Sequence, residues 1–247
     1  PDFAAGQQVK PDDARLKTEW ATVPSPAGSG SIRCVVARPA SAAAGAKLPT
    51  VLVIHENRGL NPHIEDIARR IALDGYVAFA PDALTPLGGY PAGGEDEARA
   101  LFGKLDQAKT REDMVAGAQF LRAHTLCNGK IGAVGFCYGG GVVNMLATRV
   151  PELLAGVPFY GGPAPADDVP KIKAQLLVQY AGNDARVNAG WPAYEDGLKK
   201  AGVKYTMHMY PGVEHGFNND TTPRYDKAAA ALAWSRTMEF FAATLRK

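Results

Sequence analysis

Hydrophobic residues along the chain follow two alternating patterns. Continuous apolar runs such as VLVI, YVAFA, IGAVGF and QLLVQYA are typical of strands that are buried on both faces. Between these runs apolar residues recur at helical spacing, as at Ile64, Ile67 and Ile71. Eight strands are predicted, at residues 18–23, 32–37, 50–55, 76–80, 130–135, 156–160, 175–181 and 204–210. Helices are predicted at residues 62–73, 111–123, 140–148, 191–201 and 225–245.

The alternation of strand and helix from residue 50 onward predicts an α/β fold. We expect a mostly parallel central sheet of about eight strands with helices on both faces. The first two strands, joined by the turn-rich PSPAGSGS, are predicted to form an antiparallel hairpin at one edge. No linker divides the chain, so residues 1–247 are predicted to form a single domain, with residues 1–17 as an N-terminal extension. The Gly- and Pro-rich residues 86–94 are interpreted as a long loop at the functional edge of the sheet.

Composition and charge narrow the class of protein. The chain has 247 residues, of which 46% are hydrophobic, and 27 basic against 25 acidic side chains give a net charge of +2. These values indicate a globular protein and offer no charged surface for nucleic acid or an anionic membrane. No apolar run is long enough to cross a membrane, so we expect a soluble protein. Three cysteines are too few for a disulfide scaffold; they favour the cytoplasm, with a periplasmic form after removal of an export signal as the alternative.

The segment GFCYGGG, between a predicted strand and a predicted helix, carries the strongest chemical signal. Gly135, Cys137 and Gly139 have the spacing of a nucleophile elbow, in which a reactive side chain sits on a tight turn flanked by small residues. The helix N-terminus that follows would lower the pKa of the thiol and bind a developing oxyanion. A buried structural cysteine in a Gly-rich turn is the alternative.

An activated nucleophile needs a base and an acid that orients the base, and both are found at the ends of later strands. Asp184 follows QLLVQYA, and His215 follows KYTMHMY, so the order Cys137, Asp184, His215 matches the order in this fold class. His55, which ends the strand VLVIH, is the alternative base. Asp82 is the alternative acid, although an Asp in that place is more often used to fix a loop.

Six segments together resemble the dienelactone hydrolase (carboxymethylenebutenolidase) family of α/β-hydrolases. They are HENRGLNPHIEDIARR, GYVAFAPD, GFCYGG, PFYGG, GNDARV and PGVEHGF. The resemblance implies the α/β-hydrolase fold and a catalytic triad of Cys137, Asp184 and His215. It also implies that Glu56 contacts the resting thiol and disfavours the thiolate until substrate binds; an ion pair with Arg58 is the alternative role for Glu56. The oxyanion hole would be formed by the backbone N–H groups of Tyr138 and Asn57.

The sequence departs from the family pattern at the predicted substrate site. Family members that cleave dienelactone bind the substrate carboxylate with two arginines, and one of these positions is Asn219 in this chain. Arg99 is the candidate for the other arginine, and Arg58 could substitute as an anion contact. Four aromatic residues are further candidates for contacts with substrate, or for the core: Tyr90, Tyr160, Trp191 and Phe217.

The predicted function is therefore cofactor-independent hydrolysis of a small ester or lactone by way of an acyl-thioester on Cys137. No motif for a metal or a phosphate-bearing cofactor is present, so neither is expected. The expected partner is a small-molecule substrate, and the chain is expected to be a monomer or a homodimer. Two other classes stay open: a non-catalytic relative that binds a small ligand, and a redox sensor at Cys137, which would need a second thiol to resolve it.

Overall fold

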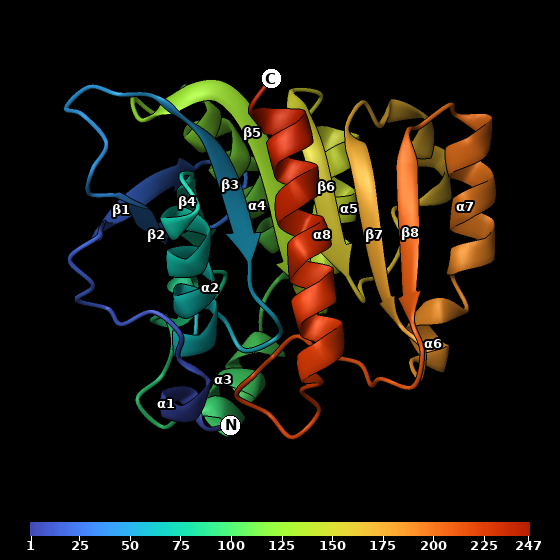
Figure 1. Cartoon of the computed structure of the whole chain (residues 1–247), viewed down its shortest axis with the longest axis horizontal. Coiled ribbons are helices and arrows are strands. Elements are labelled where there is room, and N and C mark those ends of the chain that lie inside the picture. Colours follow the sequence, from blue (N-terminus) through green and yellow to red (C-terminus); the bar gives the residue numbers. More distant parts are fainter. The chain divides into compact units, whose positions relative to one another are not determined.

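The computed structural model describes residues 1–247, which divide into two compact units (Figure 1). Residues 7–131 form what we call the N-terminal unit, and residues 1–6 with 132–247 form the C-terminal unit. The predicted single domain stays a prediction, and each unit is described by itself below. None of the helices combines the length and the apolar character needed to cross a bilayer.

The N-terminal unit contains an antiparallel hairpin joined to a parallel strand pair. Its elements are β1 (Leu16–Ser25), β2 (Gly30–Pro39), β3 (Leu48–Ile54), α2 (Pro62–Leu73), β4 (Val77–Pro81), the 3-10 turn η1 (Thr85–Leu87), α3 (Glu95–Phe102), α4 (Gln107–Ala123) and the start of β5 (Cys127–Phe136). The strand order is β1-β2-β4-β3. Strand β2 pairs antiparallel with β1 and with β4, and β3 pairs parallel with β4. Helix α2 packs on β2, β3 and β4, and α4 packs on β1, β3 and β4 from the other face (Figure 1).

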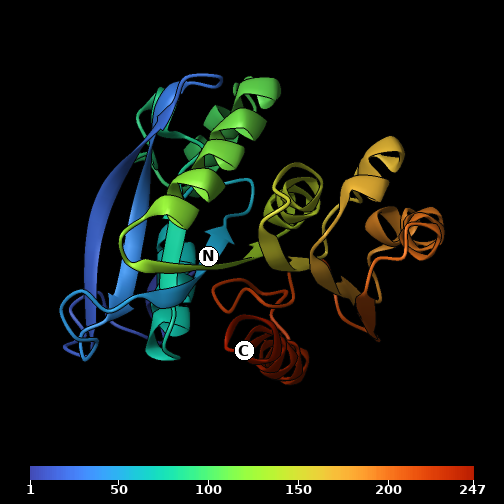
Figure 2. The ribbon, with the colours of Figure 1, turned by 90° about the horizontal axis from the view of Figure 1, so that it is seen from above.

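The C-terminal unit contains a series of parallel strands that follows β5 in the sheet. Its elements are α1 (Phe3–Gly6), α5 (Tyr138–Arg149), β6 (Leu153–Phe159), the 3-10 turn η2 (Ala166–Lys171), β7 (Gln175–Ala181), α6 (Ala185–Asn188), α7 (Trp191–Lys200), β8 (Tyr205–Tyr210) and α8 (Lys227–Leu245). The order is β5-β6-β7-β8, with β6, β7 and β8 parallel to one another. Seen from above, α5 and α8 lie on opposite faces of these strands (Figure 2).

The predicted elements are confirmed, and the differences lie at helix starts and in short helices. All eight predicted strands form at the predicted places, and the first two make the edge hairpin. Helix α4 begins four residues earlier than predicted because the Asp106 carboxylate caps it by accepting the N–H of Lys109. Asp226 caps α8 in the same way, two residues later than predicted. The helix α3, which follows the predicted loop at 86–94, and the short α1 and α6 were not predicted.

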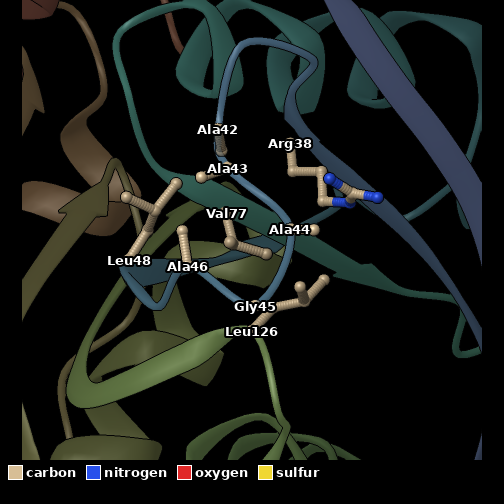
Figure 3. A pocket seen from close by; sticks show the side chains of 9 residues that line it. All are labelled: Arg38, Ala42, Ala43, Ala44, Gly45, Ala46, Leu48, Val77 and Leu126. Carbon is tan, nitrogen blue, oxygen red and sulfur yellow. The ribbon is translucent and has the colours of Figure 1, made fainter.

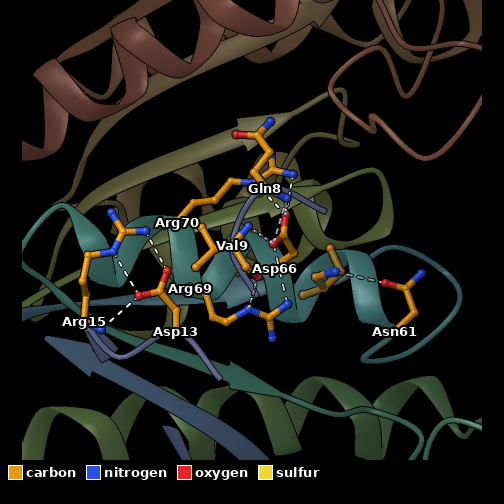
Figure 4. Close-up of polar contacts among 9 residues, drawn as sticks. Gln8, Val9, Asp13, Arg15, Asn61, Asp66, Arg69 and Arg70 are labelled. Carbon is orange, nitrogen blue, oxygen red and sulfur yellow. Dashed lines mark hydrogen bonds and ion pairs between the residues drawn. The ribbon is translucent and has the colours of Figure 1, made fainter. Parts of the chain in front are cut away.

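A buried carboxylate anchors residues 8 and 9 to helix α2 (Figure 4). Asp66 accepts the backbone N–H of Val9 at 2.8 Å and that of Gln8 at 3.1 Å. It also pairs with Arg70 at 2.6 Å, while the Arg69 guanidinium donates to the Val9 carbonyl at 2.8 Å. Because these side chains are at most one-tenth exposed, their charges are compensated by one another and by the backbone.

Asp66→Ala should lower the free energy of unfolding by about 3 kcal/mol, since it leaves two nearly buried guanidinium groups without their carboxylate. Chemical denaturation followed by circular dichroism measures this change. The matched control is Asp168→Ala, which removes the partner of Lys171 in an exposed pair and should change stability by less than about 0.5 kcal/mol. Equal effects of the two substitutions would contradict the proposed role of Asp66.

Candidate active site

Cys137 occupies a strained turn between β5 and α5. Its backbone has φ 60° and ψ −116°, a conformation that side-chain-bearing residues rarely adopt. The Cys137 N–H donates to the Phe159 carbonyl at 3.0 Å, and the Cys137 carbonyl accepts the N–H of Gly140 at 3.0 Å. Helix α5 begins at the next residue, Tyr138, so the turn leads directly into the N-terminus of that helix. The turn thus has the backbone geometry predicted for a nucleophile elbow.

Glycines make this turn possible because the backbone segments approach too closely for side chains. A Cβ on Gly135 would collide with the carbonyl of Gly139. A Cβ on Gly140 would lie 2.5 Å from the carbonyl oxygen of Phe159, and a Cβ on Gly161 would collide with Gly140. The sequence spacing of small residues around Cys137 is therefore a packing requirement of the elbow.

The structure brings together the three residues predicted as a triad, all from the C-terminal unit. His215, in the loop after β8, places Nε2 3.0 Å from Cys137 Sγ. Its Nδ1 lies 2.5 Å from Oδ2 of Asp184, which directly follows the Gly182–Asn183 turn after β7. Asp184 is buried, whereas Cys137 and His215 are partly exposed. The arrangement suits proton transfer between thiol and imidazole, with the carboxylate fixing the imidazole tautomer.

A segment after β6 supports both the turn and the histidine. The Tyr160 ring packs against the His215 ring with centroids 4.9 Å apart, and Tyr160 itself has a positive φ of 36°. Its N–H donates to the Gln179 carbonyl at 2.7 Å. Tyr160 was predicted as a substrate contact; its ring is 1% exposed and lies beside the imidazole, and a contact with substrate stays a prediction.

Two polar residues that the sequence analysis missed hold this segment in place. The Asn144 side chain on α5 donates to the Gly162 carbonyl at 2.8 Å, and it accepts the Tyr194 hydroxyl at 2.8 Å. Both residues are buried. The signal for Asn144 was present in the sequence, since it is the one polar residue in the otherwise apolar VVNMLA of a buried helix.

His55 and Asp82, the alternative base and acid, have structural roles within the N-terminal unit. His55 is fully buried; its Nδ1–H donates to the Glu56 carbonyl at 2.6 Å, and its Nε2 accepts the Ala83 N–H at 3.1 Å. Both ring nitrogens are thus engaged by the backbone, which fixes a neutral tautomer. Asp82 accepts the N–H groups of Leu84 at 3.0 Å and Leu60 at 3.3 Å, so it fixes its loop.

Five residues predicted for the site lie in the N-terminal unit, and their catalytic or binding roles stay predictions. Glu56 is 8% exposed. The Arg58 guanidinium donates to the Asn57 side chain, and Arg99 is exposed on α3. The Tyr90 hydroxyl donates to Glu95 at 2.7 Å, and burial together with this carboxylate raises the pKa of Tyr90.

The remaining predicted substrate contacts lie in packed surroundings within the C-terminal unit. Trp191 packs edge-on against Tyr180 and Tyr205 and is 7% exposed. Phe217 is fully buried, with its ring 5.4 Å from that of Tyr160. The Asn219 side-chain oxygen accepts the N–H and the hydroxyl of Thr221, at 3.0 and 2.6 Å. These contacts are those of core and loop residues, and binding of substrate by all three stays a prediction.

A cavity of about 220 Å³ in the N-terminal unit is lined by the loop Ala42–Ala46, by Leu48, Val77 and Leu126, and by a single charged residue, Arg38 (Figure 3). It contains no nucleophile and no titratable pair. No three His, Cys, Asp or Glu side chains gather around a point suited to a metal ion.

Several known proteins are similar to this chain. The model of the dienelactone hydrolase family matches residues 32–245. A protein of Saccharolobus solfataricus, provisionally named a carboxymethylenebutenolidase, is 34% identical over 227 residues, covering 77% of this chain and 87% of its own. A protein of Synechocystis with the same provisional name is 33% identical over 217 residues, covering 80% and 87%. A crystal structure from Klebsiella pneumoniae, provisionally named a dienelactone hydrolase, superposes with a TM-score of 0.78 at 27% identity, covering 92% and 98%.

The buried His55 should make stability depend on pH. Desolvation lowers the pKa of His55 below its usual 6.5, so the unfolded chain binds a proton that the native protein does not. The free energy of unfolding should therefore fall as pH drops below about 6.5, by up to about 1.4 kcal/mol per pH unit from this residue. Denaturation across this range should show a shallower slope for His55→Gln. The slope should persist in the control variant His208→Gln. The pKa of His208 is also lowered, but that side chain is only partly buried.

Proposed function

Because the chain belongs to the dienelactone hydrolase family and has the α/β-hydrolase fold predicted from its sequence, we propose that it hydrolyses a small ester or lactone through Cys137. Membership of this family shows that the chain is a hydrolase similar to dienelactone hydrolase. The cysteine nucleophile, the acyl-thioester and the type of bond cleaved are the proposal.

One observation carries the proposal: Asp184, His215 and Cys137 form a continuous hydrogen-bonded row that ends at the strained turn. A buried structural cysteine needs neither a histidine at 3.0 Å nor a left-handed backbone. Cys137 also directly precedes α5, which is where a nucleophile elbow places its reactive residue. These features support the role of Cys137 as a nucleophile.

In the first half-reaction His215 Nε2 takes the proton of the Cys137 thiol, and Asp184 stabilises the imidazolium through Nδ1–H. The thiolate forms a bond to the carbonyl carbon, and the electron pair of the C=O bond moves to oxygen. The Tyr138 N–H, at the start of α5, is the proposed donor to this oxyanion. The intermediate then collapses, the C–O bond to the leaving group breaks, and His215 returns its proton to the departing oxygen.

In the second half-reaction a water molecule takes the place that the leaving group has vacated. His215 takes a proton from the water as its oxygen attacks the thioester, and the thiolate leaves and is protonated again. A thiolate leaves more easily than an amide nitrogen, so the tetrahedral intermediate partitions toward product only when the leaving oxygen is comparably good. The chemistry therefore favours activated esters and enol lactones over amides.

Two other functions receive less support from the structure. A redox sensor needs a resolving thiol, yet Cys127 begins β5 while Cys137 follows its end, and ten residues of strand span about 30 Å. A non-catalytic ligand-binding protein would have no need for the hydrogen-bonded row. The roles predicted for Glu56 and Asn57, and a cytoplasmic location, stay predictions.

Cys137→Ala should lower the rate of p-nitrophenyl acetate and enol-lactone hydrolysis at least about a thousandfold, because the attacking atom is removed. Release of p-nitrophenolate, and loss of the enol-lactone absorbance, measure the rate. The matched control is Cys127→Ala, which removes a buried thiol outside the hydrogen-bonded row and should keep full activity. Hydrolysis that survives in folded Cys137→Ala, or is equally absent from the wild type, would contradict the proposal.

A further inference from the structure

We propose that the chain forms a homodimer in which the β1 strands of two copies pair antiparallel, edge to edge, about a two-fold axis at Thr18. Strand β1 is the last strand of the order in its unit, with β2 as its neighbour (Figures 1 and 2). Its residues 17–20 are exposed. An exposed edge strand presents backbone donors and acceptors to a second chain.

The hydrogen-bond pattern of the hairpin shows which residues face outward from β1. The Ala40 N–H donates to the Arg15 carbonyl at 2.8 Å, and the register places Arg15 opposite Ala40, one step beyond Leu16 opposite Pro39. Because backbone groups alternate sides along an antiparallel strand, odd-numbered residues bond inward to β2. The N–H and C=O groups of Thr18, Trp20 and Thr22 therefore point outward. The Leu16 carbonyl also points outward, while its N–H donates to Asp13.

A two-fold axis at Thr18 makes this edge complementary to itself. It places Lys17 opposite Glu19 of the second copy, and Glu19 opposite the second Lys17. It also places Leu16 of each copy opposite Trp20 of the other copy. Four backbone hydrogen bonds follow: two between the Thr18 residues, and two from the Trp20 N–H groups to the Leu16 carbonyls.

Neighbouring registers are disfavoured by the same residues. An axis at residue 17 or residue 19 would place two lysines or two glutamates directly opposite each other, which is destabilising. An axis at Trp20 would pair Glu19 with Ala21 and would place Leu16 opposite Pro24, which has no N–H to donate. The charge pattern and the proline thus select one register.

The side chains at this edge leave an apolar surface to be covered. Trp20 is 49% exposed, with the Arg33 guanidinium 4.2 Å from its ring centroid. Trp20 also lines a hollow of about 190 Å³, together with Pro11, Thr18, Glu19 and Val35. Leu16 of the second copy would cover the exposed ring in the proposed register, whereas a single copy leaves it to water.

Sedimentation velocity over a dilution series tests the proposal with the full chain. The wild type should form a dimer that dissociates on dilution and weakens with salt, because the interface is confined to one strand and contains two ion pairs. Lys17→Glu and Glu19→Lys should each raise the dissociation constant at least about tenfold, since attractive pairs become repulsive. The double variant with both changes restores opposite charges across the axis and should dimerise like the wild type.

Mixing the two single variants distinguishes this interface from any other dimer interface. The Lys17→Glu copy presents two glutamates and the Glu19→Lys copy presents two lysines, so a heterodimer should form even where neither variant dimerises alone. Unchanged circular dichroism and ester hydrolysis show that each variant is folded. A wild type that is monomeric at every concentration, or a dimer that survives Lys17→Glu, would overturn the proposal.

Discussion

The backbone conformation of Cys137 is the constraint on which the site depends. A non-glycine residue at φ 60° costs of the order of 1–3 kcal/mol and persists only where the surroundings enforce it. Here the surroundings are the close contacts at Gly135, Gly140 and Gly161, and the hydrogen bond from the Cys137 N–H to Phe159. Substitution of any of these glycines would force the segments apart. The strain therefore ties the position of the thiol to the packing of β5, α5 and the end of β6.

The same packing positions the histidine. The segment that accepts the Cys137 N–H continues into Tyr160, whose ring lies against His215, and into Gly162, whose carbonyl is held by Asn144. Tyr194 secures Asn144 in turn from α7. The thiol and the imidazole are thus both held by the same short stretch of backbone. This fixes the distance between them more firmly than two independent loops would.

Much of this could be predicted from the sequence, since it depends on local pattern. Runs such as VLVI and QLLVQYA located the buried strands, and GFCYGGG located the turn, because small residues at that spacing have a steric cause. The positions of Cys137, Asp184 and His215 at strand ends predicted that these three side chains meet, and the structure brings them together. The start of α4 was misplaced because capping by Asp106 outweighs the weak amphipathic pattern of its first turn.

What could not be predicted depends on three-dimensional packing. Trp191 and Phe217 stand at positions where an aromatic side chain can face either a pocket or the core, and pattern alone does not decide between them. The part played by Asn144 depends on a carbonyl eighteen residues away and a hydroxyl from another helix. Short helices such as α6, with four residues, are too brief to carry a periodic signal.

In the proposed mechanism the acyl group passes through the sulfur of Cys137. The most direct test is mass spectrometry of the protein quenched in acid during turnover of p-nitrophenyl acetate, followed by peptide mapping. We expect one added acetyl group, held as a hydroxylamine-sensitive thioester on the peptide that contains Cys137. Turnover without acylation of that peptide, or acylation at another residue, would contradict it.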